Sequence, residues 1–335
     1  MHNSMRINFV TLKYIVALDI YRNFVRAAQS CGVTQPTLSA AIKNMETELD
    51  IVIFDRDSHP VKPTRTGEKI IEMARLVLRD VSMIEEFVLA EKGSEAGEVS
   101  VGIIPTVAPY VLPGLFREIR DSYPAVKLKV AEMRTSFLIE KLRSAELDMA
   151  ILATPQKHNG LLEIPLYYER FIAYVSPDDD FYSLGEIPSD MLPSDRLWVL
   201  EEGHCFRNQV FGFCHGGRQT HAEYQAGSIG TLVNIVDRNG GYTVIPELHA
   251  SLLSDVQSKN LRPIVCGRDG TVSGENISGG HPGDKGNCCP VREVSLLIRD
   301  DFVRERLLNV IAGCIRRIIP DSMLDTRLKR FAIKI

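Results

Sequence analysis

Residues 24–39 have the sequence FVRAAQSCGVTQPTLS, and this stretch predicts two short helices joined by a tight turn. The first helix ends at Gly32, because glycine adopts the backbone conformations of a tight turn at little cost. The second begins after Thr34, a favourable N-cap residue, and Pro36 stands in its first turn, where a missing N–H is harmless. The stretch therefore predicts a helix-turn-helix.

The segments on either side complete a winged helix. Apolar residues between positions 9 and 21 predict a preceding helix. After the motif, residues 51–54, a turn at residues 57–60 and the following Val61 predict a β-ribbon wing. We assign residues 1–65 to this domain.

The second helix of the motif has two different faces. Leu38, Ile42 and Met45 repeat at steps of four and three residues, which places them on one inward stripe. Short polar groups in the first turns of such a helix can reach base edges in the major groove of DNA, and neighbouring cations can reach phosphates. An ordinary solvated face is the alternative. The candidate DNA contacts are Gln35, Pro36, Thr37, Ser39 and Lys43 on this helix and Arg56 on the wing.

A longer helical pattern follows the wing. Its apolar residues are spaced alternately by four and three, at Ile70, Ala74, Val77, Val81, Ile84 and Val88. This spacing is a heptad seam of about three repeats, and a seam of that length needs a partner helix. We therefore predict a dimerising linker helix and hinge over residues 66–96. Packing of one amphipathic helix on its own domain is the alternative.

From residue 97 onward, strands alternate with helices, which predicts a mostly parallel sheet with right-handed crossovers. Later strand and helix patterns suggest a second α/β lobe and a return to the first, so the fold class is α/β. We assign the first part of lobe I to residues 97–166, lobe II to residues 167–299 and the return of lobe I to residues 300–335. Within lobe II, residues 267–290 form a Gly-rich polar insertion.

Composition limits the possible partners. The 335 residues include 39 Lys plus Arg and 43 Asp plus Glu, a formal net charge of −4, so contact with DNA has to be local. No stretch approaches the roughly 18 apolar residues of a membrane-spanning helix, and no signal peptide opens the chain. We therefore expect a cytoplasmic protein without a membrane partner.

The chain has seven cysteines, an odd number, which argues against a structural disulfide framework in a protein of this size. Each thiol therefore needs its own explanation, and the commonest role of a free cysteine is that of a small buried hydrophobe. Adjacent Cys288 and Cys289 match no regular spacing of zinc ligands, so we expect neither a metal nor a cofactor.

The helix-turn-helix, together with Phe54-Asp-Arg56 and Thr64-Arg-Thr-Gly67, resembles the winged-helix end of LysR-type transcriptional regulators. The remaining chain fits the effector domain of that family, two α/β lobes like those of periplasmic binding proteins. The resemblance implies a DNA-binding regulator and not an enzyme. It also implies a homotetramer of two dimers that binds double-stranded promoter DNA and acts on RNA polymerase.

Two other stretches are similar to the peroxide-sensing OxyR branch of that family: Ile104-Pro-Thr106 and residues 202–214, EGHCFRNQVFGFC. In that branch the thiol matching Cys205 reacts with hydrogen peroxide, and the thiol matching Cys214 closes an intramolecular disulfide that a cellular dithiol reduces. The branch activates peroxide-defence genes. The residues that the resemblance assigns to peroxide binding and activation are Thr106, Thr135, His204 and Arg299, with Arg207 as a nearby cation. Asn208 departs from the Asp that related sensors commonly carry.

The proposed disulfide has a geometric consequence. If Cys205 and Cys214 lie on one helix, the rise between them is roughly 13 Å, whereas a disulfide needs Cα atoms within about 7 Å. Forming the bond would therefore unwind or reroute the segment between them, which makes it a switch. The reaction also needs a thiolate, so Arg207 and His204 are the candidate cations that would lower the pKa of Cys205.

Two alternatives remain open from the sequence. A small metabolite bound between the lobes can act as the inducer, with the cysteines incidental. A thiol peroxidase uses the same attack on peroxide with turnover, although the N-terminal DNA-binding motif argues against that class.

Overall fold

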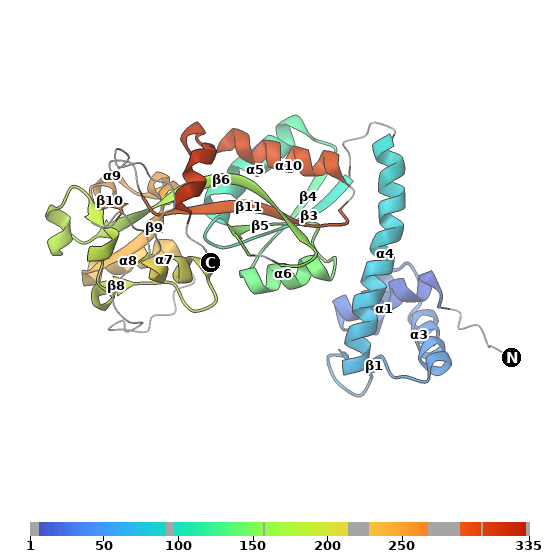
Figure 1. The fold of residues 1–335 in the computed structure, drawn as a ribbon. Helices are drawn as coiled ribbons and strands as arrows, with labels where there is room; N and C mark the ends of the chain where they lie inside the picture. The colour runs from blue at the N-terminus through green and yellow to red at the C-terminus, as the bar shows by residue number, and fades with distance from the viewer. Residues whose placement is uncertain are drawn as a thin grey trace. The chain divides into compact units, whose positions relative to one another are not determined.

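The structure is a computed structural model of the chain and describes residues 7–91, 97–156, 158–213, 228–266, 289–302 and 304–332. The chain forms two compact units (Figure 1). The smaller unit comprises Met1–Ser94 and Arg143–Glu146, and the larger unit comprises Glu95–Leu142 and Leu147–Ile335. Each unit is described by itself.

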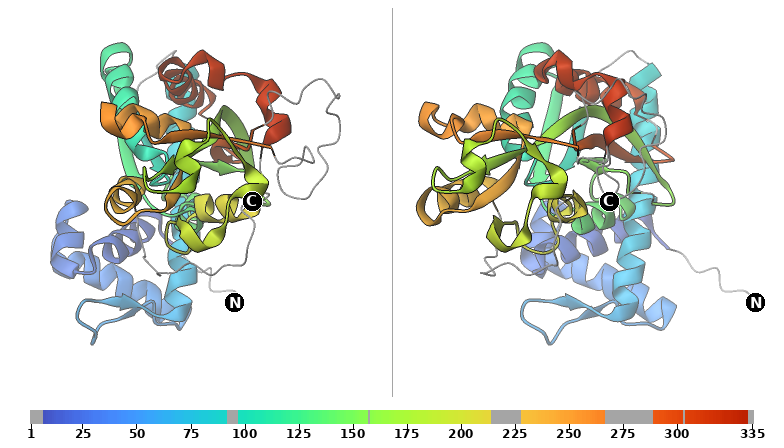
Figure 2. Two further views of the ribbon diagram at one scale, coloured as in Figure 1. Left: turned by 90° about the vertical axis from the view of Figure 1, so that its left-hand side faces the viewer. Right: turned by 60° about the vertical axis from the view of Figure 1, so that its left-hand side comes forward.

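The smaller unit is a winged helix-turn-helix followed by a long helix. Its elements are α1 (Phe9–Tyr21), α2 (Phe24–Ser30), α3 (Gln35–Leu49), β1 (Phe54–Asp55), β2 (Lys62–Pro63) and α4 (Arg65–Glu91). Side-chain caps start the first three helices: Asn8, Asn23 and Thr34 each accept a hydrogen bond from a backbone N–H of the following turn. β1 and β2 pair antiparallel, and Figure 2 shows this ribbon as a hairpin extending away from the helices of its unit.

The core of the smaller unit joins the motif to α4. Leu38 and Ile42 on α3 are fully buried against apolar residues of α1, as the sequence pattern predicted. Gly67 is required where α4 meets the wing, because a Cβ at this position would lie 2.0 Å from the carbonyl oxygen of Ile53. The wing, α3 and the start of α4 are therefore one packed body.

The larger unit is built on one mixed sheet. Its strands are β3 (Gly97–Ile103), β4 (Val126–Glu132), β5 (Met149–Thr154), β6 (Leu161–Val175), β7 (Ile187–Pro188), β8 (Leu197–Trp198), β9 (Tyr242–Pro246), β10 (Leu261–Val265) and β11 (Val291–Arg299). Its helices are α5 (Ala108–Ser122), α6 (Thr135–Arg143), α7 (Cys205–Phe213), α8 (Ile229–Asn239), α9 (Asp255–Ser258) and α10 (Glu305–Ile318). The strand order is β4-β3-β5-β11-β6-β10-β7, with β9 pairing β6 and β8.

Two hydrophobic cores divide this sheet into two lobes. One core lies under β3, β5, α5 and α10, and the other under β9, α8 and the first turns of α7. Figure 1 shows α5 and α10 on one face of the first lobe and α6 on the other. The long strand β6 belongs to both lobes, since its first part pairs with β11 and its last part with β9 and β10. The predicted α/β class with a two-lobed effector domain is confirmed.

Some expectations differ in extent from the structure. Apolar patterns in the sequence predict strands at residues 171–176 and 294–298. The first matches only the end of β6, and β11 begins three residues before the second, at Val291. Charged residues inside both strands, Glu169 and Arg292, interrupt the apolar pattern that would have revealed them. The Gly-rich insertion predicted at residues 267–290 lies outside the described residues except for its last two positions.

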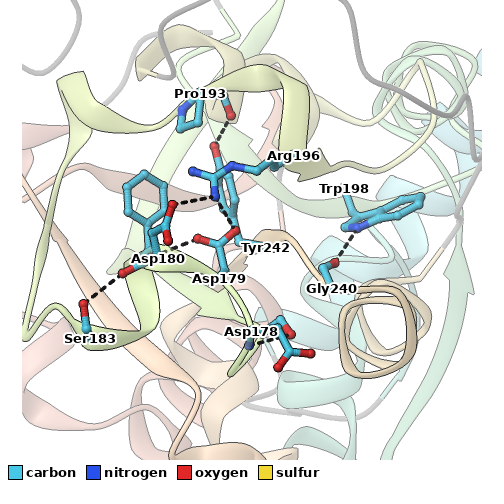
Figure 3. A network of polar contacts seen from close by, with 11 residues as sticks. Asp178, Asp179, Asp180, Ser183, Pro193, Arg196, Trp198, Gly240 and Tyr242 are labelled. Carbon is cyan, nitrogen blue, oxygen red and sulfur yellow. Dashed lines mark hydrogen bonds and ion pairs between the residues drawn. The ribbon is translucent and has the colours of Figure 1, made fainter.

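A polar network fixes the strand that leads to the predicted thiol segment (Figure 3). Arg196, just before β8, binds the buried Asp179 carboxylate at 3.0 Å and lies 3.8 Å from Asp180. Tyr242 on β9 donates its hydroxyl hydrogen to the carbonyl oxygen of Pro193. Trp198 on β8 donates to the carbonyl oxygen of Gly240 at 3.0 Å. β8 is therefore held in place by side chains as well as by its pairing with β9.

Within the described part of the chain, no helix combines the length and the apolar character needed to cross a membrane.

Candidate functional site

Cys205 is the first residue of α7, and its thiol is free and almost buried, with 8% of the residue exposed. The chain enters the helix through Gly203, whose φ of +96° lies in the left-handed region that favours glycine. The side chain of Cys205 therefore lies at the positive end of the helix dipole.

Arg292 on β11 is the arginine that the tertiary structure brings to this thiol. Its side chain is completely buried, and it binds the equally buried Glu169 on β6 with Nε at 2.6 Å and Nη2 at 2.5 Å from Oε1. On its other side it donates to Thr106, with Nη1 3.0 Å from the hydroxyl oxygen and Nη2 2.8 Å from the carbonyl oxygen. The guanidinium also lies 5.1 Å from the ring centroid of Phe206, the residue after Cys205.

These contacts keep Arg292 positively charged. Burial opposes its charge, but the Glu169 carboxylate, Tyr167 and Cys205 more than offset that effect, so the pKa of Arg292 is raised above its usual range. Burial raises the pKa of Glu169, and the guanidinium opposes that rise. The site therefore contains a fixed cation within electrostatic range of the thiol.

His204, by contrast, contributes no cation at neutral pH. It is 5% exposed, and burial, followed by the positive charge of Arg134, lowers the pKa of its imidazole. Glu201 opposes this shift, and its Oε1 lies 3.7 Å from Nε2 of His204. Arg134 itself forms an ion pair with Glu201. A neutral imidazole in this position can still donate or accept a hydrogen bond.

Several buried polar atoms on α6, α7 and β6 have no hydrogen-bond partner among the described residues. They are both amide atoms of Gln209, the hydroxyl of Thr135 and the hydroxyl of Tyr167. Gln209 lies four residues after Cys205 on α7, so the two side chains share one face of the helix. An unpaired buried polar group costs about 1–3 kcal/mol, so these atoms are expected to meet water or a small polar molecule.

The two arginines predicted from the sequence, Arg207 and Arg299, make other contacts. Arg207 donates to the carbonyl oxygen of Leu200 at 3.1 Å, and its guanidinium lies 5.4 Å from the ring of Phe211. Arg299 ends β11, seven residues from Arg292 and therefore roughly 23 Å along the strand, where it binds Asp301. Of the predicted set, Thr106 is the residue that directly contacts the arginine beside the thiol.

In the smaller unit, the first turn of α3 is open to solvent. Gln35, Pro36 and Thr37 are exposed, as is Lys43 two turns further along. The hydroxyl of Thr37 contacts the N-cap hydroxyl of Thr34 at 2.8 Å. Three of the candidate DNA contacts therefore occupy an accessible helix end.

Arg56, the predicted DNA contact on the wing, binds side chains of α3. Arg56 binds the Glu46 carboxylate at 2.8 Å and donates to the Ser39 hydroxyl at 3.3 Å. Glu46 is buried, and its other oxygen accepts the backbone N–H groups of Ile53 and Phe54 at 2.8 and 3.1 Å. This carboxylate fixes the wing against α3.

Comparison with known families agrees with both units. Residues 9–68 match the family model of the bacterial regulatory helix-turn-helix protein, lysR family, and residues 92–266 match the LysR substrate binding domain. The chain belongs to the LysR family. Members of this family are DNA-binding transcription regulators, so this LysR-family protein is a regulator and not an enzyme.

Several relatives of the LysR-family chain carry informative names. The "Hydrogen peroxide-inducible genes activator" of Haemophilus influenzae is 35% identical over 77% of this chain and 86% of its own length. A full-length cysteine-to-aspartate variant of OxyR from Pseudomonas aeruginosa is 32% identical, with a TM-score of 0.75 over 93% of this chain and 98% of that chain. A hydrogen-peroxide-bound cysteine-to-serine variant of OxyR from Corynebacterium glutamicum is 27% identical, with a TM-score of 0.56 over 93% and 94% of the two chains. The expected resemblance to the OxyR branch is confirmed.

Sequence analysis of this LysR-family regulator missed Arg292, Glu169, Gln209 and Tyr167. The pair Arg292 and Glu169 leaves a faint signal, namely opposite charges inside two apolar strands, but nothing in the sequence indicates that these strands are neighbours. Cys214, the predicted resolving thiol, lies outside the described residues. Within the described part of the chain, no cluster of His, Cys, Asp and Glu is arranged to hold a metal ion.

Proposed function

We propose that this LysR-family regulator activates transcription in response to hydrogen peroxide and that Cys205 is its sensing thiol. The observation that carries the proposal is the placement of a free, nearly buried cysteine at a helix N-terminus, within electrostatic range of the buried Arg292. The names of the relatives, which include peroxide-inducible activators and a peroxide-bound OxyR, support the oxidant.

The chemistry of the first step matches these groups. The Cys205 thiolate attacks one oxygen of hydrogen peroxide, an S–O bond forms, and the O–O bond breaks. Sulfur loses two electrons and becomes a sulfenic acid, while the second oxygen leaves as hydroxide and is protonated to water. Arg292 and the Thr106 hydroxyl that it contacts would hold the oxidant and stabilise the departing oxygen, with Thr135, Gln209 and neutral His204 as further hydrogen-bonding groups.

The second step would trap the change in a disulfide with Cys214. The helical rise from Cys205 to Phe213 is about 12 Å, and consecutive Cα atoms are about 3.8 Å apart, so residue 214 stays more than about 7 Å from Cys205 while α7 is helical. Disulfide formation therefore requires α7 to unwind or to change course. Unwinding would remove Phe206 from Arg292 and repack the side chains in contact with α7, until a cellular dithiol reduces the bond.

The proposed partners of the smaller unit are promoter DNA and a second copy of the chain. Gln35, Pro36 and Thr37 would contact bases, and Ser39, Lys43 and Arg56 would fix the helix and wing on the phosphates.

The α4 seam positions Val77, Ile84 and Val88 are 45–66% exposed, which supports a homodimer through this helix. An Ile84→Glu variant that sediments with the same mass as the wild type would exclude this interface, and Glu72→Lys, away from the seam, is the control.

We further propose assembly of two dimers into a tetramer and activation through RNA polymerase, both of which follow the family. Promoter DNA as the partner implies that the protein works in the cytoplasm.

Footprinting on promoter DNA, before and after one equivalent of hydrogen peroxide, tests the function directly. We expect the protected region to change with oxidation, and mass mapping of the same samples should find Cys205 joined to Cys214. Cys205→Ser should retain the reduced footprint at every peroxide concentration, whereas Cys314→Ser, which removes a buried thiol of the first lobe, should respond like the wild type. A Cys205→Ser variant that still responds would contradict the proposal and favour a metabolite as inducer.

A further inference from the structure

Tyr167 carries a buried hydroxyl that has no role in the proposed oxidation of Cys205. Its side chain is completely buried in the first lobe, in the same hydrophobic core as Cys205. Its hydroxyl has no hydrogen-bond partner among the described residues. A tyrosine hydroxyl taken from water without a partner costs free energy that a phenylalanine would not, so its presence in this core needs an explanation.

The strand register places this hydroxyl group on the same face of the sheet as the arginine beside the thiol. On β6, Tyr167 lies two residues before Glu169, and successive even steps along a strand point to one face. Glu169 is directly opposite Arg292 on β11, and Tyr167 is opposite Val294, with no irregularity between the two pairs. Tyr167, Glu169 and Arg292 therefore share one face.

The electrostatics agree with this placement. Tyr167 and Cys205 are both among the groups that act on the charge of Arg292, so the guanidinium lies within range of the phenol and of the thiol. Burial, with the nearby Glu169 carboxylate, raises the pKa of Tyr167 well above its ordinary value. The hydroxyl therefore keeps its proton at every physiological pH and can donate a hydrogen bond.

We propose that the Tyr167 hydroxyl is a further hydrogen-bond donor of the thiol site, directed at the oxygen that leaves when Cys205 is oxidised. This inference rests on the proposed function. When hydrogen peroxide oxidises the Cys205 thiolate, the O–O bond breaks and negative charge develops on the departing oxygen. A fixed donor held in a water-poor site stabilises such a charge without first having to reorient.

The test compares peroxide with an oxidant-free reagent for the same sulfur. Stopped-flow rate constants are measured for reduced full-length Tyr167→Phe with hydrogen peroxide and, separately, with iodoacetamide, which alkylates the thiolate without an oxygen leaving group. We expect the rate constant with peroxide to fall about tenfold or more, since loss of one such donor commonly costs that much. The rate constant with iodoacetamide should stay unchanged.

Tyr168→Phe is the matched control. Tyr168 is the next residue on the same strand, it is also buried, and its hydroxyl meets Glu293 on the opposite face of the sheet. This variant should keep both rate constants of the wild type. Tyr167→Phe removes an unpartnered hydroxyl, so its free energy of unfolding should not fall, and misfolding would not explain a slower reaction.

Three results would overturn the inference. An unchanged peroxide rate in Tyr167→Phe means that the hydroxyl only binds water. An equal fall in both rates means that the residue acts on the thiol and not on the leaving oxygen. If Cys205 of the wild type reacts with peroxide no faster than a free cysteine, the proposed function itself fails, whatever the variant does.

Discussion

At the scale of single residues, Arg292 and Glu169 form the most consequential contact of the larger unit, which is the regulatory unit of the protein. Both side chains are completely buried, and each would be left as an unpaired charge by loss of the other. The pair therefore supplies two things at once, stability of the sheet and a fixed cation beside Cys205. Removing one partner of a buried ion pair strongly destabilises the folded protein, because the other charge stays buried without compensation.

We predict that Arg292→Gln lowers the free energy of unfolding of the reduced protein by about 3–5 kcal/mol, because the Glu169 carboxylate stays buried without its cation. Urea titration measures this change. The double variant Arg292→Gln with Glu169→Gln should recover part of the loss, since no charge remains buried. A single variant as stable as the wild type would contradict the ion pair.

A second residue-scale prediction concerns pH. His249 lies on the turn after β9, and its Nδ1 is hydrogen-bonded to the Tyr110 hydroxyl at 2.8 Å. Burial lowers the pKa of its imidazole below the ordinary value of 6.5. Below pH 6.5 the unfolded chain therefore binds a proton that the folded protein still rejects. The free energy of unfolding should therefore fall as the pH drops below 6.5. Above that pH, protonation of His249 should add nothing to the pH dependence of stability.

Urea titrations at about pH 7 and about pH 5.5 check the sign of this effect. His249→Asn, which keeps a hydrogen-bonding side chain for Tyr110, should lose less stability between these pH values than the wild type. His158→Asn is the control at a histidine away from this pair. An identical pH dependence in the wild type and His249→Asn would show that the buried imidazole is not responsible.

At the scale of elements, the wing of the DNA-binding unit depends on one carboxylate. Glu46 joins α3 to the backbone of Ile53 and Phe54 and holds Arg56 beside Ser39. The hairpin β1–β2 has only two paired residues on each strand, so its own ladder gives it little rigidity. The side chain of Glu46 therefore sets the position of the wing.

We predict that Glu46→Ala lowers the free energy of unfolding by about 1–3 kcal/mol, because two buried N–H groups lose their acceptor. It should also weaken binding to promoter DNA, since Arg56 is no longer aligned. Chemical denaturation and fluorescence anisotropy measure the two effects. Glu48→Ala, an exposed acidic neighbour on the same helix, removes the same charge and should change neither quantity.

At the scale of the whole molecule, the regulatory unit combines a segment suited to rearrangement with a framework that resists it. α7 has nine residues, and Cys205 is its first. Immediately before this segment, β8 is anchored by the Arg196–Asp179 ion pair and by the hydrogen bond of Trp198 (Figure 3). A change that starts at the thiol should therefore spread through α7 and stop at β8.

Hydrogen exchange followed by mass spectrometry tests this boundary. We predict that one equivalent of peroxide increases exchange at the amides of α7, because its backbone hydrogen bonds are lost, and leaves β8 and β9 as protected as before. Cys205→Ser treated in the same way should show no change. Increased exchange throughout the second lobe would mean that the anchor does not limit the transition.

Much of the fold could be predicted because the deciding signals are local. The turn at Gly32, the N-cap Thr34 and the alternating four-and-three spacing of α4 depend on neighbours within a few residues, and the structure has helices α2, α3 and α4 at these places. The motif around Cys205 is also continuous in sequence, so the candidate thiol could be found without coordinates. The sequence by itself thus determined the winged helix, the α/β class and the likeness to LysR-type regulators.

The surroundings of the thiol were decided only by the tertiary structure. Arg292 is 87 residues from Cys205, and it comes within electrostatic range of the thiol only through the tertiary fold, in which β11 lies between β5 and β6. Nearness in sequence points to Arg207 as the cation, whereas the structure shows its guanidinium donating to the carbonyl oxygen of Leu200. A periodic pattern shows which face of an element is buried, but the pairing of distant strands depends on the packing of the whole chain, and that pairing put Arg292, Glu169 and Tyr167 together.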